Sequence, residues 1–83
     1  MEYVYKLTTT IQNDGDNFST ITAVYDSFDT AVKSLRKHLK LFKQDYKADE
    51  SNSFINSIEQ TATAILNVGY NKIRMTIIRE EKQ

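Results

Sequence analysis

The chain has 83 residues, with eleven basic and eleven acidic side chains and no cysteine or proline. A chain of this length supports one hydrophobic core, so we expect a single domain over residues 1–83. The zero net charge argues against a generic binder of polyanions, and the lack of cysteine excludes a disulfide framework and a thiolate metal site. Because no apolar run reaches membrane-spanning length and residues 1–6 show no signal-peptide pattern, we expect a cytoplasmic protein.

Residues 2–25 are predicted to form a β-hairpin. In 2–12 alternate side chains share one face of a strand: Tyr3, Tyr5, Leu7, Thr9 and Ile11. The tract 13–17 contains Asp14-Gly15, the commonest short hairpin signal, and 18–25 is a return strand rich in β-branched side chains. Both faces of the return strand are partly apolar, so the sequence leaves open which of them meets the core.

The stretch 26–47 is predicted to form a long amphipathic helix at about 27–47. Its apolar side chains recur at helical spacing: Phe28, Ala31, Val32, Leu35, Leu39, Phe42 and Tyr46. The side chain of Asp26 or Ser27 caps the first turn, where Asp29 suits the positive end of the helix dipole. We expect this helix to pack across one face of the sheet.

Six basic side chains of this helix share an arc of roughly 120° that flanks the apolar stripe. They are Lys33, Arg36, Lys37, Lys40, Lys43 and Lys47, and we call them the basic arc. Exposed lysines are common, so an ordinary solvated face is one interpretation. The other is a binding surface for phosphates or for an acidic partner.

The segment 53–67 fits more than one structure. In a helix its apolar side chains lie within an arc of about 120°: Phe54, Ile55, Ile58, Ala62, Ile65 and Leu66. Alternatively, 61–66 is a strand that pairs across a turn at 67–71, either alone or after a short helix over 51–58. We favour the helix over 53–67, which Gly69 would terminate.

The remaining segments complete the predicted architecture. Residues 48–52 are expected to form a polar loop, 71–79 a strand, and 80–83 a frayed tail. The predicted fold is α+β, with a three- or four-stranded antiparallel sheet, one long amphipathic helix on one face, and a possible second short helix.

Four further residues are tentative binding residues. Leu41 lies off the apolar stripe and Tyr70 lies in a predicted turn, so the two could form a contact patch. Asp14 and Asp16 at the hairpin tip could imitate phosphate spacing toward a basic partner, although turn formation and solubility are the ordinary roles of such residues.

We expect no catalytic activity, no metal and no cofactor. A lone histidine, His38, without cysteine makes a zinc site a poor fit, and no nucleophile elbow is present. Two glycines cannot build a phosphate-binding loop, and so small a core leaves little room for an active-site pocket.

In overall make-up the chain resembles small accessory proteins of bacterial phages and mobile elements, including anti-CRISPR inhibitors. The resemblance rests on short length, a Lys/Asn/Ile/Thr-rich composition without cysteine or proline, and a strand that enters a capped helix over 24–29. It implies a non-enzymatic module that binds and inhibits or regulates a host or phage protein stoichiometrically. It assigns a role to no individual residue.

Two alternatives stay open. One is a nucleic-acid-binding protein that uses Lys33, Lys37, Lys40 and Lys47. The other is a structural or assembly subunit. No membrane partner is expected, and the sequence does not give the oligomeric state.

Overall fold

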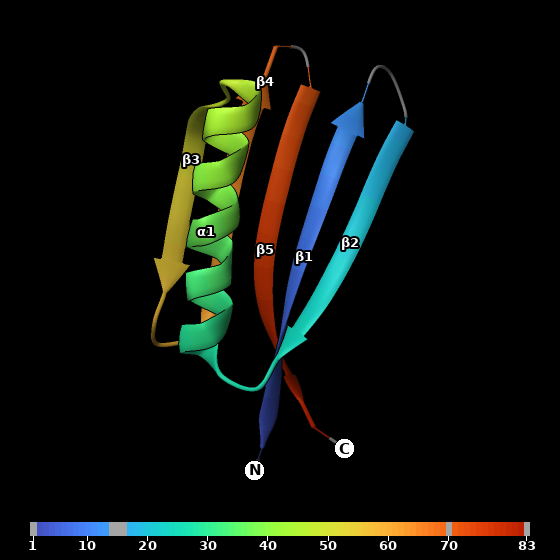
Figure 1. The fold of residues 1–83 in the computed structure, drawn as a ribbon. Helices are drawn as coiled ribbons and strands as arrows, with labels where there is room; N and C mark the ends of the chain where they lie inside the picture. The colour runs from blue at the N-terminus through green and yellow to red at the C-terminus, as the bar shows by residue number, and fades with distance from the viewer. Residues whose placement is uncertain (1, 14–16, 70, 83) are drawn as a thin grey trace.

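A computed structural model of the chain describes residues 2–13, 17–69 and 71–82. Across these residues the elements are β1 (Tyr3–Asn13), β2 (Asn17–Tyr25), α1 (Phe28–Tyr46), β3 (Asp49–Asn56), β4 (Thr61–Val68) and β5 (Asn71–Glu81). The strands form one antiparallel sheet in the order β2-β1-β5-β4-β3, and α1 lies across one face of it (Figure 1). The α+β class and the long helix on one face are confirmed, but the sheet has five strands instead of three or four.

The predicted hairpin of β1 and β2 is confirmed. The two strands pair antiparallel, with Tyr5 opposite Tyr25 and Thr8 opposite Thr22. The hydroxyl oxygen of Tyr25 lies 2.6 Å from Oγ of Ser34 in α1, so the face of β2 that carries Tyr25 is the helix-facing one. This contact answers the question that the sequence left open. The predicted turn residues 14–16 lie outside the described residues.

The helix begins and ends within one residue of the predicted bounds. Ser27, not Asp26, is the N-cap, because its Oγ accepts a hydrogen bond from the amide of Thr30 at 3.2 Å. The helix ends at Tyr46, and Lys47 adopts a left-handed conformation with φ of 51°. Lys47 therefore follows the helix instead of extending its last turn.

The structure contradicts the prediction for 48–67. The polar loop at 48–52 and the helix at 53–67 are both wrong, because β3 and β4 run through this region, and no second helix occurs among the described residues. The strand alternative for 61–66 is confirmed. Ala62, Ala64 and Leu66 are buried at every second position of β4, a period that a helix cannot produce.

A tight turn separates β3 from β4. The side-chain Oδ1 of Asn56 accepts hydrogen bonds from the amides of Ile58 at 3.1 Å and Glu59 at 3.0 Å. Gln60 then takes a left-handed conformation with φ of 57°. Asparagine bonding to the backbone two residues on is a typical way to start such a turn without glycine or proline.

The last strand is longer than predicted. β5 extends to Glu81, so a frayed tail from residue 80 is wrong for Glu80 and Glu81. They are held because β1 pairs with β5 along almost its whole length, with Tyr3 opposite Glu81. Beyond the strand, the amide of Lys82 donates a 2.9 Å hydrogen bond to the carbonyl of Glu2, and the two ends of the chain lie together in Figure 1.

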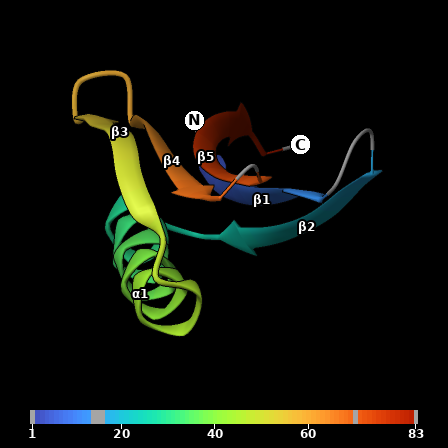
Figure 2. The same ribbon diagram turned by 90° about the horizontal axis from the view of Figure 1, so that it is seen from above.

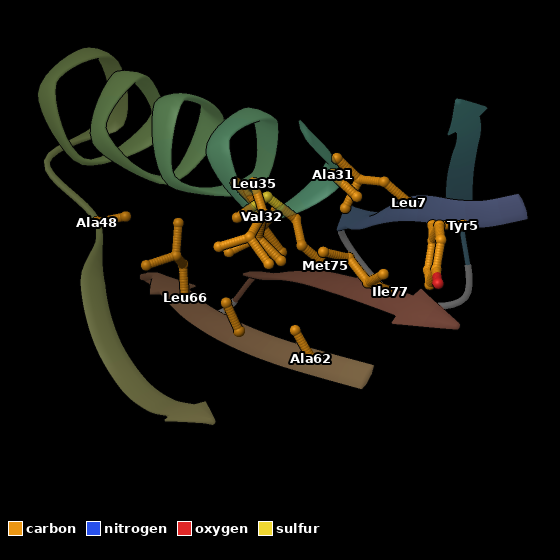
Figure 3. Close-up of a cluster of buried hydrophobic side chains, with 12 residues drawn as sticks. Tyr5, Leu7, Ala31, Val32, Leu35, Ala48, Ala62, Leu66, Met75 and Ile77 are labelled. Atoms are coloured by element: carbon orange, nitrogen blue, oxygen red, sulfur yellow. The ribbon is translucent and has the colours of Figure 1, made fainter. Parts of the chain in front are cut away.

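The core lies between α1 and the central strands (Figure 3). The largest fully buried side chains are Leu7, Leu66, Met75 and Ile77, and α1 contributes Ala31, Val32 and Leu35. Tyr5 is buried, as expected from its strand face, and its ring centroid lies 5.9 Å from that of Phe28. Its hydroxyl donates a 2.7 Å hydrogen bond to Oε1 of Gln60, so the one polar atom of this buried ring is satisfied.

The single helix leaves the other face of the sheet uncovered. Figure 2 shows α1 on the side of β3 and β4, with β1 and β2 extending away from it. The uncovered face carries side chains from alternate strand positions, among them Thr8, Thr10, Thr20, Thr22, Thr61, Thr63 and Thr76. Threonine suits this position because it combines a β-branched side chain with a solvated hydroxyl. No described helix is both long and apolar enough to cross a bilayer.

Candidate interaction surface

All six side chains of the basic arc are exposed. The arc lies on the flank of α1 that faces β3, because Lys43 forms an ion pair with Glu50 of β3. The other five form no ion pair with another described residue. The arc therefore presents a row of mostly unpaired positive charges beside one edge of the sheet, with Asp29 next to its N-terminal members.

The Lys43–Glu50 pair affects the pKa of the Glu50 carboxyl. The hydrogen bond from Lys43, followed by that from Ser53, lowers the pKa of the Glu50 carboxyl below its ordinary value of 4.5. About a third of each side chain is in contact with solvent, so this ion pair contributes little to stability. The pair links the C-terminal half of α1 to the beginning of β3.

Three large apolar side chains are exposed at the end of β3. Phe54 is 58% exposed, Ile55 36% and Ile58 93%. Phe54 and Ile55 are neighbours in the strand and so lie on opposite faces, while Ile58 stands in the turn that follows. A scattered exposed side chain is ordinary, but these three lie within five positions of the chain, around one end of the sheet edge, and we call them the β3 patch.

A groove separates the β3 patch from the first half of α1. Its volume is about 250 Å³, and its apolar lining residues are Phe28, Val32 and Ile55. Lys33, Arg36, Asp29 and Ser57 complete the lining, so its charged residues are two cations and one carboxylate. The groove thus brings two members of the basic arc next to the exposed apolar side chains, a juxtaposition that the sequence order does not show.

The outer edge of β3 is open. Among the described residues β3 pairs with β4 alone, and no other element lies beyond it. The register shifts between Glu50 and Asn52, which disrupts the ladder near the start of the strand. The second half, 53–56, pairs without interruption and carries neither lysine nor proline, the residues that natural edge strands use to prevent pairing with other chains.

The other predicted binding residues lie elsewhere or outside the described residues. Leu41 is 42% exposed, but helical geometry places it near Ser34, on the flank of α1 that faces β2 and opposite to the β3 side. Tyr70, Asp14 and Asp16 lie outside the described residues. Leu41 therefore lies next to Lys37, four residues before it, but on the side of α1 away from the groove, and the β3 patch is a surface that the sequence interpretation missed.

The described residues form no evident metal or catalytic site. Among the described residues no three His, Asp or Glu side chains come together in a way that could hold a metal ion. A small hollow of about 120 Å³ lies near the end of α1, lined mainly by Ile11, Tyr46, Val68 and Ile73. It offers no set of acid, base and nucleophile, and His38 is half-buried on the helix away from it.

No family model, no curated protein and no solved structure matches this chain. Of the residues of the β3 patch, Ile58 had a visible signal in the sequence: an isoleucine between Asn56-Ser57 and Glu59-Gln60 stands alone in a polar tract.

Proposed function

We propose that the chain is a small non-enzymatic protein-binding module that acts by stoichiometric binding, as an inhibitor or regulator of a host protein encoded by a phage or mobile element. The observation that carries the binding function is the β3 patch beside the unpaired cations of the basic arc. Exposed apolar side chains at an edge are costly in a free monomer, because they invite aggregation. A bound partner would cover these side chains and remove that cost.

The β3 patch and the basic arc would contribute to binding in different ways. Apolar anchors such as Phe54 and Ile58 supply affinity once they are desolvated, and truncation of such an anchor typically costs about 2 kcal/mol or more. The basic arc at the rim stays wetter, so it steers association and selects the partner's charge more than it adds affinity. Both features fit a cytoplasmic partner with an acidic, partly apolar surface.

The test compares two exposed isoleucines, one in the turn after β3 and one in β2 at the opposite edge of the sheet. Ile58→Thr alters the β3 patch, whereas Ile21→Thr alters β2, where Ile21 is 67% exposed. Each tagged variant and the parent is used for affinity capture from the native host's lysate after nuclease treatment, followed by mass spectrometry. We expect one protein that the parent and the Ile21 variant retain at near-equal stoichiometry and the Ile58 variant loses. Equal capture by all three, or capture of nothing specific, contradicts the proposal.

A nucleic-acid-binding function is the second candidate, because Lys33, Lys37, Lys40 and Lys47 form no ion pair with a described residue. It requires binding of labelled DNA or RNA that weakens steeply with salt. The double variant Lys37→Glu, Lys40→Glu should then abolish binding. Unchanged binding of both nucleic acids by this variant would eliminate the basic arc as the site. A third possibility, an assembly subunit, requires a solution mass above that of one chain.

A further inference from the structure

We infer that the outer edge of β3 accepts an extended, acidic segment of a partner protein as an additional strand of the sheet. This inference rests on the proposed function and specifies the kind of partner. Three observations support it: the open edge of β3, the position of its bulge, and the charge of the adjacent groove.

The open edge supplies the backbone groups. A strand at the edge of a sheet has a row of amides and carbonyls without partners in the sheet, and an extended peptide can pair with them. Within β3 the bulge at Glu50–Asn52 limits regular pairing to residues 53–56. The site for the added strand is therefore short and is confined to the half of β3 that carries Phe54 and Ile55.

The groove supplies the specificity. A strand added beside residues 53–56 would place alternate side chains on the helix side, next to Ile55 and near Lys33 and Arg36, which outnumber the one carboxylate of the groove, Asp29. Neither cation forms an ion pair with a described residue, so carboxylates at those positions gain partners without displacing any. The other side chains of the added strand would lie beside Phe54 on the uncovered face. The matching segment alternates acidic and apolar residues.

The same charges distinguish β3 from the second open edge, β2. The flank of α1 that faces β2 carries Ser34, His38, Leu41 and Asp45, which include no lysine or arginine. An acidic strand therefore finds Lys33 and Arg36 lining the groove beside β3, whereas beside β2 the nearest cation of α1, Lys37, lies at the margin of the flank.

A second copy of this chain fits β3 poorly. Antiparallel pairing of two β3 strands along their whole length would be interrupted by the bulge in both copies. Pairing through residues 53–56 alone would bring Lys33 and Arg36 of one copy toward the same cations of the other. Like charges brought together at an interface are unfavourable, so the occupant is a segment of opposite charge.

The probes are short synthetic peptides in which glutamate alternates with valine, with lysine-for-glutamate peptides as the charge control. A pair of glutamate–valine peptides carries N-methyl groups on alternate amides, one peptide in each of the two possible frames. In an added strand, every second amide faces the sheet, so one frame blocks pairing and the other leaves it intact. Binding is measured by fluorescence anisotropy, and nitrogen–proton correlation spectra show which amides of the protein respond.

The inference predicts binding of the glutamate–valine peptide, loss of binding in one methylation frame only, and signal changes centred on residues 53–56. The double variant Lys33→Glu, Arg36→Glu should weaken this binding by about tenfold or more. The matched variant Lys72→Glu, Arg74→Glu makes the same charge change on the uncovered face and should weaken it much less.

Any one of four results overturns the inference: no binding at millimolar peptide, equal binding in both methylation frames, signal changes centred on β2, or dimerisation of the protein through β3. These results leave the binding module itself standing if the host protein is still captured through Ile58. Loss of that capture defeats the proposed function whatever the peptides do.

Discussion

Truncation of the neighbours Ile65 and Leu66 distinguishes the observed strand from the predicted helix. In a helix both belong to one apolar stripe, so truncating either would cost similar stability. In β4 they point to opposite faces. Leu66 is 0% exposed beneath α1, whereas Ile65 is half-buried on the uncovered face.

The magnitudes follow from these positions. Truncating a fully buried leucine to alanine costs about 2–5 kcal/mol, so we expect Leu66→Ala to lose about 3 kcal/mol. Ile65→Ala removes side-chain atoms that are partly in water already, so about 1 kcal/mol is expected. A domain of this length has a total stability of roughly 4–12 kcal/mol, so Leu66→Ala loses a large fraction of it.

The assay is urea unfolding followed by far-ultraviolet circular dichroism, since the chain has no tryptophan to report by fluorescence. A milder variant, Leu66→Val, keeps the comparison measurable if Leu66→Ala is largely unfolded in water. Equal losses of stability for truncation of Ile65 and Leu66 would refute the strand and its orientation.

Three further variants test local features by the same unfolding measurement. Ser27→Ala should lose about 1 kcal/mol because it removes the N-cap, while Asp26→Ala should lose less than about 0.5 kcal/mol; the reverse order would contradict the cap assignment. Lys47→Gly should gain about 0.5–1 kcal/mol because glycine adopts the left-handed conformation without a Cβ penalty, and a loss would show that the Lys47 side chain stabilises the helix end. Glu50→Gln should lose about 0.5 kcal/mol or less at neutral pH. Because folding lowers the pKa of Glu50, its contribution is present above pH 4.5 and is lost as the pH falls through the lower folded value, so parent and variant should converge in acid; a constant difference would exclude the charge as the cause.

The sequence predicted those elements in which the buried side chains recur at one regular spacing. The 3.6-residue spacing of Ala31, Val32 and Leu35 matches the side chains that α1 buries, and alternation in β1 matches Tyr5 and Leu7. In both elements most apolar residues serve the core, and Leu41 and Tyr46 are the exposed exceptions in α1. Hydrophobic pattern and burial therefore agree, and the predicted bounds differ from the observed ones by only a residue or two.

The segment 53–67 misled the prediction for an identifiable reason. Phe54, Ile55 and Ile58 completed a helical stripe together with Ala62 and Leu66, but in the folded chain all three are exposed to solvent, Ile58 almost fully and Ile55 by about a third. Their hydrophobicity does not report burial in this chain. The same three residues form the β3 patch. The helix prediction therefore failed at the place where apolar side chains are exposed and are not needed for the core.

The candidate site was only partly predictable. The basic arc of α1 was visible because helical geometry relates residues that are close in sequence. The groove was not, because it depends on β3 lying beside α1, which brings Ile55 to Lys33 and Arg36. That placement follows from the strand order, and a single sequence contains no direct record of strand order.

The pairing of β1 with β5 also constrains how the chain acquires its structure. The first strand of the sequence lies between β2 and the last strand, and Tyr3 pairs with Glu81. During synthesis, the hairpin of β1 and β2 therefore emerges long before the neighbour that completes its sheet. Contacts of such wide sequence separation slow folding, so we expect a nascent chain to remain without its core until β5 has left the ribosome.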